Sequence, residues 1–381
     1  MSKKILVVTH SNDLSGANKS LLSILQKLCQ DFEFHVIFNA EEGSLSKEVK
    51  KLDNVRIIYA DYSWVYAKNR TKLIKKLYRY CADFLAYYKN RGIDKALLNS
   101  LKNEEYDYIY TNTSVVDFGY LLSEKLSIPH IWHIREFGKE DFSFKRLCKR
   151  SYYENMFQKA EKLIFISHAL EKNYLSKYSL NNNSKVVYNG FDIEELIYPK
   201  LNDIDSGEIN IAIIGQVSQG KGQNQAIKAC QLLSEKGYPI KLHVVGQVDE
   251  DFLKRTVPEY ETYSWLLVHG QKNDIYNFRK SIDIELVCST NEAFGRVCIE
   301  AMLHGIPVVG ANTGGTAELI QHGETGLLYP LGDHNELSKN IECLIRDKGL
   351  YKNIQKKAQE SAKQYSIDKT VAGVKNSFYG G

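Results

Sequence analysis

Short apolar runs alternate with helical patterns along almost the whole chain, and this alternation limits the folds that the chain can adopt. In the first half, we interpret residues 5–9, 34–38, 55–59, 108–111, 131–134, 163–166 and 186–188 as strands. The segments between most of these runs are long enough for crossover helices. Such an alternation predicts a parallel sheet with helices on both faces.

The pattern is interrupted at residues 198–207, where proline, asparagine, aspartate, serine and glycine gather. A second series then follows, with strands at 209–214, 241–245, 265–268, 284–288, 307–310 and 326–329, and helices at 223–236, 296–304 and 335–346. The 381 residues are too many for one ordinary core and enough for two. We therefore predict an N-terminal domain over 1–195, a linker over 196–207, a C-terminal domain over 208–365, and a final helix within 366–381 that packs back toward the N-terminal domain.

Composition argues against several classes of protein. The formal net charge is only +4, which gives no reason to expect a nucleic-acid partner. The seven cysteines are scattered without a CxxC pair, which indicates a reducing compartment and argues against a zinc site. The first apolar run is too short for a signal peptide, and no run approaches the roughly 20 residues that span a bilayer. We expect a cytoplasmic protein that could associate with the inner face of the cell membrane.

Two glutamates flank the turn that follows the strand predicted at 284–288. The helix predicted to begin near Gly295 offers backbone N–H groups and a dipole, which together suit a diphosphate. Glu292 lies in the loop ahead of these amides, and Glu300 lies more than one turn inside the helix. The two carboxylates should therefore contact different parts of a ligand, such as the hydroxyls of a sugar and of a ribose. Either glutamate taken alone is more commonly a solvated surface residue.

Two more glycine-rich turns precede helices in the second series. The turn after residues 209–214 contains Lys221, which is placed to neutralise phosphate oxygens. Its sequence follows neither the order of a P-loop nor that of a GxGxxG fingerprint. The turn after residues 307–310 contains Gly314 and Gly315. Since ligands collect beyond the carboxyl ends of parallel strands, we expect the three turns to form one site.

The segment from Cys288 to Pro330 resembles the signature of the family 4 retaining glycosyltransferases. It is similar in the Glu-x7-Glu spacing, the Phe-Gly-Arg turn, Glu-Ala-Met at 300–302, Gly-Ile-Pro-Val-Val at 305–309, Gly-Gly at 314–315, Glu318, and Gly-x-x-Gly at 323–326. Lys-Gly at 221–222 and Asn-Gly-Phe-Asp at 189–192 extend the similarity, which is strong over residues 160–345 and weaker in the N-terminal domain. The chain departs from the family at Gln216, where arginine is common.

The resemblance implies a GT-B fold, in which two Rossmann-like parallel-sheet α/β domains face a central cleft. It implies a nucleotide-diphosphate-sugar donor bound mainly by the C-terminal domain, retention of anomeric configuration, and no metal or other cofactor. Glu300 would hold the ribose hydroxyls, Glu292 the hydroxyls of the transferred sugar, and Lys221 the leaving phosphate. The donor-binding residues would be Gly16, Gln216, Lys221, Glu292, Phe294, Gly295, Arg296, Val297 and Glu300, with Lys221 and Glu292 also catalytic.

In the N-terminal domain, the resemblance places Gly16 in the first loop, near the donor phosphate or the acceptor. It places His133 near the transferred sugar as a catalytic residue, although a lone histidine is more often structural. Arg135 and Glu136 would pair with each other or contact the acceptor. Glu136 is also a candidate nucleophile for a double displacement. A front-face mechanism assisted by the leaving phosphate is the preferred hypothesis.

Residues 64–91 carry the strongest charge bias, with eight lysines and arginines against Asp83 alone, interleaved with aromatic residues. A basic helix with aromatic side chains suits an anionic membrane surface. The cations predicted to contact the membrane or the acceptor are Lys72, Lys75, Lys76 and Arg79. The alternative is a solvated helix whose apolar face packs on its own sheet.

The sequence thus predicts a retaining hexosyltransferase that moves a sugar from a nucleotide-diphosphate sugar, UDP- rather than GDP-linked, to a glycan or polyprenyl-linked acceptor in surface polysaccharide biosynthesis. One alternative is a catalytically silent GT-B subunit that binds and stabilises a partner glycosyltransferase. Gln216 and the single glycine of the first loop favour that alternative. Another alternative is a GT-B epimerase or phosphorylase.

Overall fold

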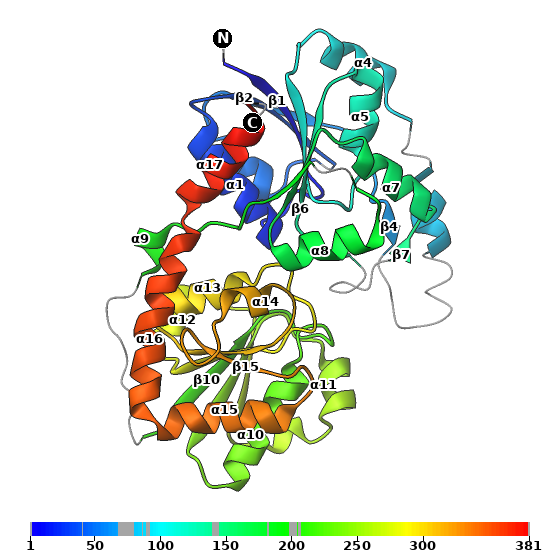
Figure 1. Cartoon of the computed structure of the whole chain (residues 1–381). Coiled ribbons are helices and arrows are strands. Elements are labelled where there is room, and N and C mark those ends of the chain that lie inside the picture. Colours follow the sequence, from blue (N-terminus) through cyan, green and yellow to red (C-terminus); the bar gives the residue numbers. More distant parts are fainter. Residues whose placement is uncertain are drawn as a thin grey trace. The chain divides into compact units, whose positions relative to one another are not determined.

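The structure is a computed structural model of the chain, and it describes residues 2–39, 41–67, 80–85, 87–88, 92–138, 145–180, 183–197, 204 and 207–379. Its contacts divide the chain into two compact units, Met1–Gly190 with Ile367–Gly381, and Phe191–Ser366. Each unit is built on one parallel sheet with helices packed against it (Figure 1). The predicted fold class, two Rossmann-like α/β domains, is confirmed. Most of the predicted linker lies outside the described residues.

The first unit contains a seven-stranded sheet in the order β3-β2-β1-β5-β6-β8-β9, in which every neighbouring pair is parallel. Its strands are β1 (Lys4–Val8), β2 (Glu33–Phe38), β3 (Val55–Tyr59), β5 (Tyr108–Asn112), β6 (His130–Ile134), β8 (Lys162–Phe165) and β9 (Ser184–Val186). A separate antiparallel pair joins β4 (Tyr66–Ala67) to β7 (Lys145–Arg146). The central strands are buried because helices cover both faces of the sheet.

Helices of the first unit come from both ends of the chain. They are α1 (Gly16–Leu28), α2 (Ser44–Val49), α4 (Lys95–Lys102), α5 (Phe118–Leu126), α7 (Arg150–Gln158), α8 (His168–Lys177) and α17 (Ile367–Ser377). The C-terminal helix α17 packs beside α1, as Figure 1 shows, and adds Val374 to the core that Leu21 and Ile24 form with the sheet. Phe378, just after α17, is also buried there. Full burial of one such side chain stabilises a fold by roughly 1.5–3 kcal/mol.

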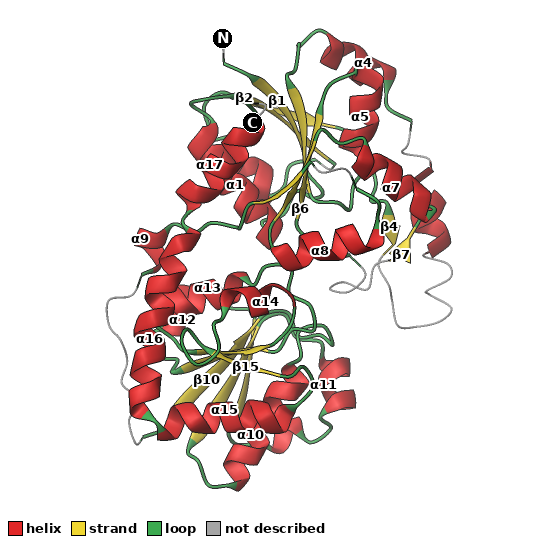
Figure 2. Ribbon diagram, in the orientation of Figure 1, coloured by secondary structure: helices red, strands yellow, loops and turns green. Residues whose placement is uncertain are grey.

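The second unit contains a six-stranded parallel sheet in the order β12-β11-β10-β13-β14-β15. Figure 2 shows this sheet, with β10 and β15 labelled, and the helices around it. Its strands are β10 (Ile209–Ile214), β11 (Ile240–Val245), β12 (Leu266–Gly270), β13 (Ile284–Val287), β14 (Val308–Ala311) and β15 (Leu327–Tyr329). Its helices are α9 (Ile193–Leu196), α10 (Gln223–Glu235), α11 (Glu250–Thr256), α12 (Ile275–Arg279), α13 (Arg296–Leu303), α14 (Gly314–Leu319), α15 (His334–Arg346) and α16 (Lys348–Ala362), with 3₁₀ turns at Tyr260–Thr262 and Lys363–Tyr365.

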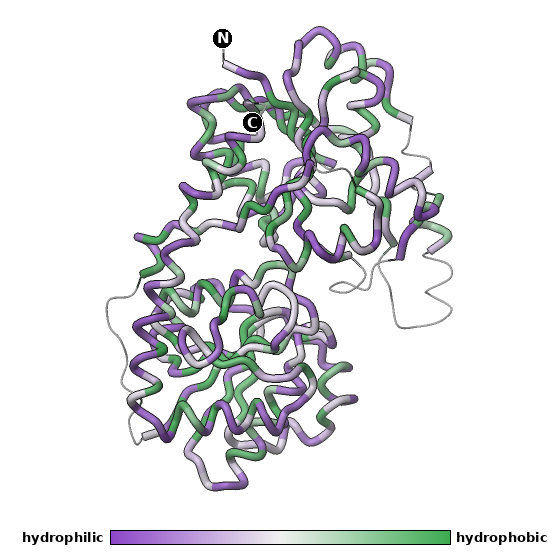
Figure 3. Tube along the Cα trace, viewed as in Figure 1, coloured by the Kyte–Doolittle hydropathy of each residue, from purple (hydrophilic) through white to green (hydrophobic). Residues whose placement is uncertain are grey.

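Apolar residues gather in the strands of both units, as the hydropathy trace shows (Figure 3). In the second unit, Ile211, Leu242 and Leu286 are buried in one core cluster. A parallel sheet that helices cover on both faces requires such continuous apolar strands, because neither face meets water. In sheets of this kind, ligands bind where the strands end.

Candidate functional site

The three glycine-rich turns predicted from the sequence follow three strands that lie side by side. Strands β10, β13 and β14 are consecutive in the second sheet, and the turns after them begin at Gly215, Cys288 and Asn312. The order of the strands reverses between β10 and β13, since β11 and β12 lie beyond β10 whereas β14 and β15 lie beyond β13. Ligands of parallel α/β sheets bind at such a switch point. The expectation that these turns gather at one sheet edge is therefore met.

Backbone contacts lock the three turns together. The amide of Thr290 donates to the Gly220 carbonyl at 2.9 Å, which joins the first turn to the second. The amide of Gly315 donates to the Glu292 carbonyl at 2.7 Å, which joins the second turn to the third. A Cβ atom on Gly315 would lie 2.4 Å from the Phe294 carbonyl oxygen, so a side chain at this position would push the turn away. The position of the second turn thus depends on both of its neighbours.

The amino end of α13 faces this edge of the sheet. Gly295 caps the helix with φ of 103°, a left-handed conformation that favours glycine. Cys298 is the first residue of the helix whose amide donates back to the Gly295 carbonyl. The amides of Arg296 and Val297 therefore precede the hydrogen-bond ladder of the helix, where backbone N–H groups and the helix dipole attract anions. These are the amides that the sequence analysis expected to meet a diphosphate.

Two of the predicted donor-binding side chains are paired with each other. The Nζ atom of Lys221, from the turn after β10, lies 2.7 Å from Oε2 of Glu292, from the turn after β13. The side chains are 35% and 16% exposed, so the pair is accessible from solvent and contributes little to stability. Gln216, from the same turn as Lys221, has an exposed side chain. A ligand that brings phosphate to Lys221 would compete with this ion pair.

Glu300 accepts a hydrogen bond from a buried arginine that was not predicted to belong to the site. Arg279, the last residue of α12, donates from Nη1 to Oε2 of Glu300 at 2.9 Å. It also donates from Nε and Nη2 to the two carboxylate oxygens of Glu285 on β13, at 2.9 and 3.0 Å. Burial opposes the charge of Arg279, but the two carboxylates outweigh it and raise its pKa. Burial also raises the pKa of Glu285, while Arg279 acts in the opposite direction.

Phe294 and Arg296 fasten the second turn to the rest of the unit. Phe294 is buried, and its ring contacts those of Tyr365 and Phe191 at centroid distances of 5.8 and 6.4 Å. The guanidinium carbon of Arg296 lies 4.4 Å from the centre of the Phe191 ring, and burial lowers the pKa of Arg296. Arg296 Nη2 is 3.6 Å from Oε1 of Glu300. Phe294 therefore anchors the turn with its ring and can meet a ligand only through its backbone.

In the first unit, His133 lies inside β6 and is fully buried. Its Nδ1 contacts the Tyr110 hydroxyl and lies 3.2 Å from Arg135 Nη2, which can only donate. Burial lowers the pKa of His133 well below its usual value, so the ring is neutral. A catalytic role for His133 stays a prediction, and its structural contacts are those of a core residue. Gly16 is exposed and opens α1, in the connection that follows β1.

Arg135 is the first residue after β6, where the carboxyl edge of the sheet begins. Its Nε and Nη1 donate to the side-chain oxygens of Asn112 and Asn189, both at 2.6 Å. Glu136 accepts from the amide and the hydroxyl of Ser114, at 2.5 and 2.7 Å. These contacts hold both charged side chains in fixed, mostly buried positions. Asn112 and Asn189 were not predicted to belong to this group.

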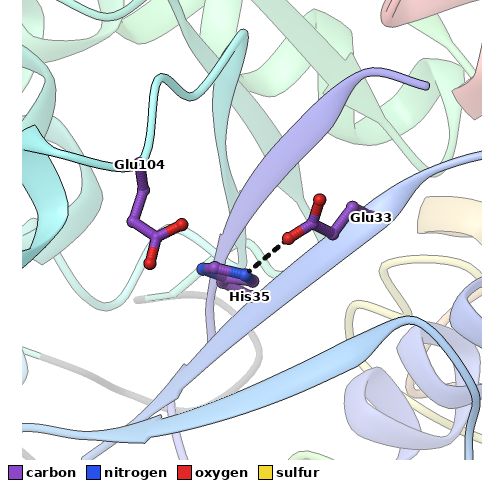
Figure 4. A group of neighbouring side chains, drawn as sticks. All are labelled: Glu33, His35 and Glu104. Carbon is purple, nitrogen blue, oxygen red and sulfur yellow. Dashed lines mark hydrogen bonds and ion pairs between the residues drawn. The ribbon is translucent and has the colours of Figure 1, made fainter. Parts of the chain in front are cut away.

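One group of potential metal ligands in the described part of the chain lies elsewhere, beside Glu33 at the start of β2. The side chains of Glu33, His35 and Glu104 converge there (Figure 4). The Nζ atom of Lys4 lies 3.3 Å from Glu33 and 2.9 Å from Glu104, and Arg56 Nη1 lies 2.7 Å from Glu104. These two cations already compensate the carboxylates. We therefore assign no metal to this group. It lies at the amino ends of the strands of the first sheet, opposite to their carboxyl ends.

The predicted membrane-contacting cations, Lys72, Lys75, Lys76 and Arg79, lie outside the described residues. Farther along the chain, Phe84, Leu85 and Tyr88 are exposed. Across the described ranges, none of the helices combines the length and the apolar composition that crossing a membrane requires.

Comparisons with known proteins agree with this geometry. The profile described as Glycosyltransferase Family 4 matches residues 14–195, and the profile described as Glycosyl transferases group 1 matches residues 196–361. A Campylobacter jejuni relative is 22% identical over 95% of this chain and 96% of its own length. Its name is N-acetylgalactosamine-N,N'-diacetylbacillosaminyl-diphospho-undecaprenol 4-alpha-N-acetylgalactosaminyltransferase. The Staphylococcus aureus capsular polysaccharide biosynthesis glycosyltransferase CapM is 27% identical over 47% of this chain and 44% of its own.

Among solved structures, Anabaena HepE in complex with UDP and glucose has a similar fold, with a TM-score of 0.76 at 22% identity over 99% of both chains. HepE in complex with UDP-glucose gives a TM-score of 0.75. The two family profiles meet between residues 195 and 196 and together match residues 14–361, which include every strand of the two large sheets except β1. The chain is a glycosyltransferase of family 4 with the GT-B fold.

Proposed function

We propose that this glycosyltransferase moves a hexose from a UDP-sugar to a glycan or polyprenyl-linked acceptor, with retention of anomeric configuration, during surface polysaccharide biosynthesis. The observation that carries the proposal is the group of three interlocked turns at the switch point of the second sheet. There Lys221, Glu292, the amino end of α13 and Glu300 come from neighbouring segments. This combination offers a cation, backbone amides and two carboxylates to one ligand.

Each group suits one part of a nucleotide sugar. A carboxylate accepts hydrogen bonds from vicinal hydroxyls, so Glu300 would take the ribose and Glu292 the transferred sugar. The amides of Arg296 and Val297 would meet the diphosphate. Lys221 would leave Glu292 and stabilise the negative charge that develops on the leaving phosphate. Lys221 and the amino end of α13 supply positive charge to the phosphates. The proposed reaction therefore needs no metal ion, and activity should persist in EDTA.

The choice of donor and acceptor rests on the relatives. HepE was solved with UDP and with UDP-glucose, which favours uridine over guanosine. The Campylobacter jejuni relative is named for a diphospho-undecaprenol acceptor, which favours a polyprenyl-linked one. Such an acceptor would bring the enzyme to the inner face of the cell membrane. For retention we favour a front-face mechanism, in which the leaving phosphate itself assists the incoming hydroxyl.

A thermal-shift screen against UDP- and GDP-sugars tests the donor site directly. A ligand present at 100 times its dissociation constant stabilises the folded state by about 2.7 kcal/mol, which is readily measured. We expect stabilisation by a UDP-sugar, and a smaller stabilisation in Glu300→Ala, which removes the acceptor proposed for the ribose. If no nucleotide sugar stabilises the protein, the proposed function is wrong.

A second candidate function is a silent subunit that stabilises a partner glycosyltransferase. The neutral, exposed Gln216 favours it, because the family commonly has arginine at this place. Slow hydrolysis of the bound nucleotide sugar without acceptor separates the two candidates. Hydrolysis that depends on Lys221 supports the enzyme, whereas tight binding without any turnover supports the silent subunit.

A further inference from the structure

The contacts of Arg279 define a buried group of three charges, Arg279, Glu285 and Glu300, which we call the Arg279 triad. Arg279 is 2% exposed and Glu285 is fully buried, whereas the Glu300 side chain is 22% exposed. The triad therefore runs from the interior of the second unit to its surface, and Glu300 is the member that a ligand can reach. Glu300 is also the residue to which we assign the ribose of the donor.

Packing alone does not account for the triad. Glu285 stands in β13 between Ile284 and Leu286, both of them buried apolar residues. Desolvation of two charges costs several kcal/mol, and replacing a buried ion pair by apolar residues of similar volume is often neutral or stabilising. An apolar pair at these two positions would thus serve the core at least as well. The charges indicate a role at Glu300, where the triad reaches the surface.

The hydrogen bonds show how the triad acts on Glu300. Glu285 engages two of the three nitrogens of Arg279, and only Nη1 remains directed at Glu300. Arg279 therefore holds Oε2 of Glu300 through one nitrogen and does not clasp the carboxylate with both ends of its guanidinium, while Arg296 Nη2 lies 3.6 Å from Oε1. The triad carries a formal net charge of −1, because Glu285 already compensates the arginine. The Glu300 carboxylate thus has a fixed orientation, and as a carboxylate it accepts hydrogen bonds from hydroxyl donors.

We propose that Arg279, anchored by Glu285, is a positioning residue that orients Glu300 toward the two vicinal hydroxyls of the donor ribose. This inference rests on the proposed function, since it assigns the ribose to Glu300. Arg279 acts through Glu300 and does not itself touch the nucleotide. A positioning role changes how strongly the protein distinguishes a ribose from a deoxyribose. A purely structural role changes the affinity for both nucleotides equally.

The test measures the dissociation constants of UDP and 2′-deoxy-UDP, and of GDP and 2′-deoxy-GDP, by titration calorimetry. The ratio of the deoxy to the ribo constant is the ribose discrimination. For the wild-type protein we expect a ratio of about ten or more, because the lost hydroxyl donates to a charged acceptor. In Arg279→Met/Glu285→Met, which removes both buried charges together, we expect the ratio to fall by about threefold or more.

Two further variants keep the test decisive. If the double variant does not fold, Arg279→Lys takes its place, because an ammonium still compensates Glu285 but cannot reproduce the fork of three bonds. The same threefold fall is expected. The matched control is Lys236→Met/Glu342→Met. It removes an ion pair outside the site, in which Lys236 Nζ at the end of α10 lies 2.5 Å from Glu342 Oε2 on α15. This control should keep the wild-type ratio.

The possible results separate the two proposals. If the wild-type protein binds neither UDP nor GDP, the proposed function fails and the inference fails with it. If it binds them with a ratio near one, Glu300 does not hold the ribose. The inference and that assignment are then overturned, whereas the proposed transfer from a nucleotide sugar stands. The inference is also overturned if the wild-type ratio is high and the variants change it by less than threefold, even when they weaken both nucleotides.

Discussion

Gly315 offers a sharp test of the idea that the three turns form one rigid site. Its backbone φ is not in the left-handed region, so alanine is compatible with the local conformation, and in α14 it would ordinarily stabilise the helix by up to about 1 kcal/mol. The obstacle is the Phe294 carbonyl, 2.4 Å from the added Cβ, where ordinary contact begins at 3.4 Å. Gly315→Ala must therefore move the turn that carries Glu292 by about 1 Å.

A displacement of this size is large for an active site. Misplacing groups by about 1 Å can cost on the order of 100-fold in rate. Overpacking typically costs about 1–3 kcal/mol, so the protein should remain folded. We expect Gly315→Ala to reduce acceptor-independent UDP-sugar hydrolysis by about 100-fold and to weaken UDP-sugar binding, measured by product release and calorimetry.

The matched control is Gly207→Ala, since an added Cβ at Gly207 meets nothing within 4 Å. It should leave hydrolysis, binding and thermal stability at wild-type values. If Gly315→Ala hydrolyses the donor within about twofold of wild type, the contact between the second and third turns does not position the site, and our account of its rigidity is refuted.

Four further predictions follow from the same contacts. Glu292→Ala should weaken UDP-sugar but not UDP, whereas Glu300→Ala should weaken both, as calorimetry with the two ligands will show; equal effects would contradict the assignment. Lys221→Met should slow hydrolysis by about 100-fold or more with a smaller change in donor affinity, because it acts on the leaving phosphate. Replacing all four predicted membrane cations by glutamine, at Lys72, Lys75, Lys76 and Arg79, should reduce sedimentation with anionic liposomes, and unchanged binding would exclude this surface. Burial lowers the pKa of His130 to about 3 in the folded protein. As the pH falls, the histidine is therefore protonated in the unfolded chain before it is in the folded one, and stability should fall below about pH 6.5. Urea denaturation should show that the free energy of unfolding falls less between pH 7 and pH 5 in His130→Asn than in the wild-type protein. The difference should be up to about 1.4 kcal/mol per pH unit.

The regular elements could be predicted because the signal is local. The strand at 209–214 and the start of the helix at 296 were placed at the residues where the structure has β10 and α13. Most other strands differ by one or two residues at their ends, where fraying and assignment are least certain. The antiparallel pair of β4 and β7 was not predicted, because two-residue strands carry no periodicity. Helix α16 was not among the predicted helices.

The point at which the chain passes between the units depends on contacts that no local pattern shows. The composition changes at residues 198–207, and the sequence analysis placed the linker there. In the structure, the Phe191 amide already donates to the Tyr365 carbonyl at 3.0 Å, and the Phe191 ring stacks on Phe294. The second unit therefore begins at Phe191 and ends at Ser366 by its contacts. Pairing between residues so distant in sequence cannot be deduced from either segment alone.

The part of the candidate site that lies in one continuous segment could be predicted from the sequence. The part whose residues come from separate segments and are brought together by folding could not. The Glu292–Glu300 segment has a fixed spacing, but Arg279 lies on a different helix. One signal was available: Glu285 is a charged residue within an otherwise apolar strand, and such a residue requires a buried partner. For β6, a shift of two residues decides the environment. His133 is inside the strand and contacts the Tyr110 hydroxyl, whereas Arg135, which is also buried, lies just beyond the strand and donates to two asparagine side chains.

The two carboxylates of the proposed donor site differ in the cation that holds each one, and this difference would let a single segment serve two purposes. Glu292 is paired with Lys221, which is 35% exposed and sits on a flexible stem, so an arriving diphosphate can take the lysine and leave Glu292 to the sugar hydroxyls. Glu300 is paired with Arg279, which is 2% exposed and fixed by Glu285, so no ligand can displace it. In the proposed site, the first carboxylate would therefore exchange its partner when the donor binds, and the second would keep its partner throughout. A site built in this way would recognise the nucleotide with a rigid carboxylate. The pair of Lys221 and Glu292 would separate only when phosphate and sugar hydroxyls are both present to bind the two side chains.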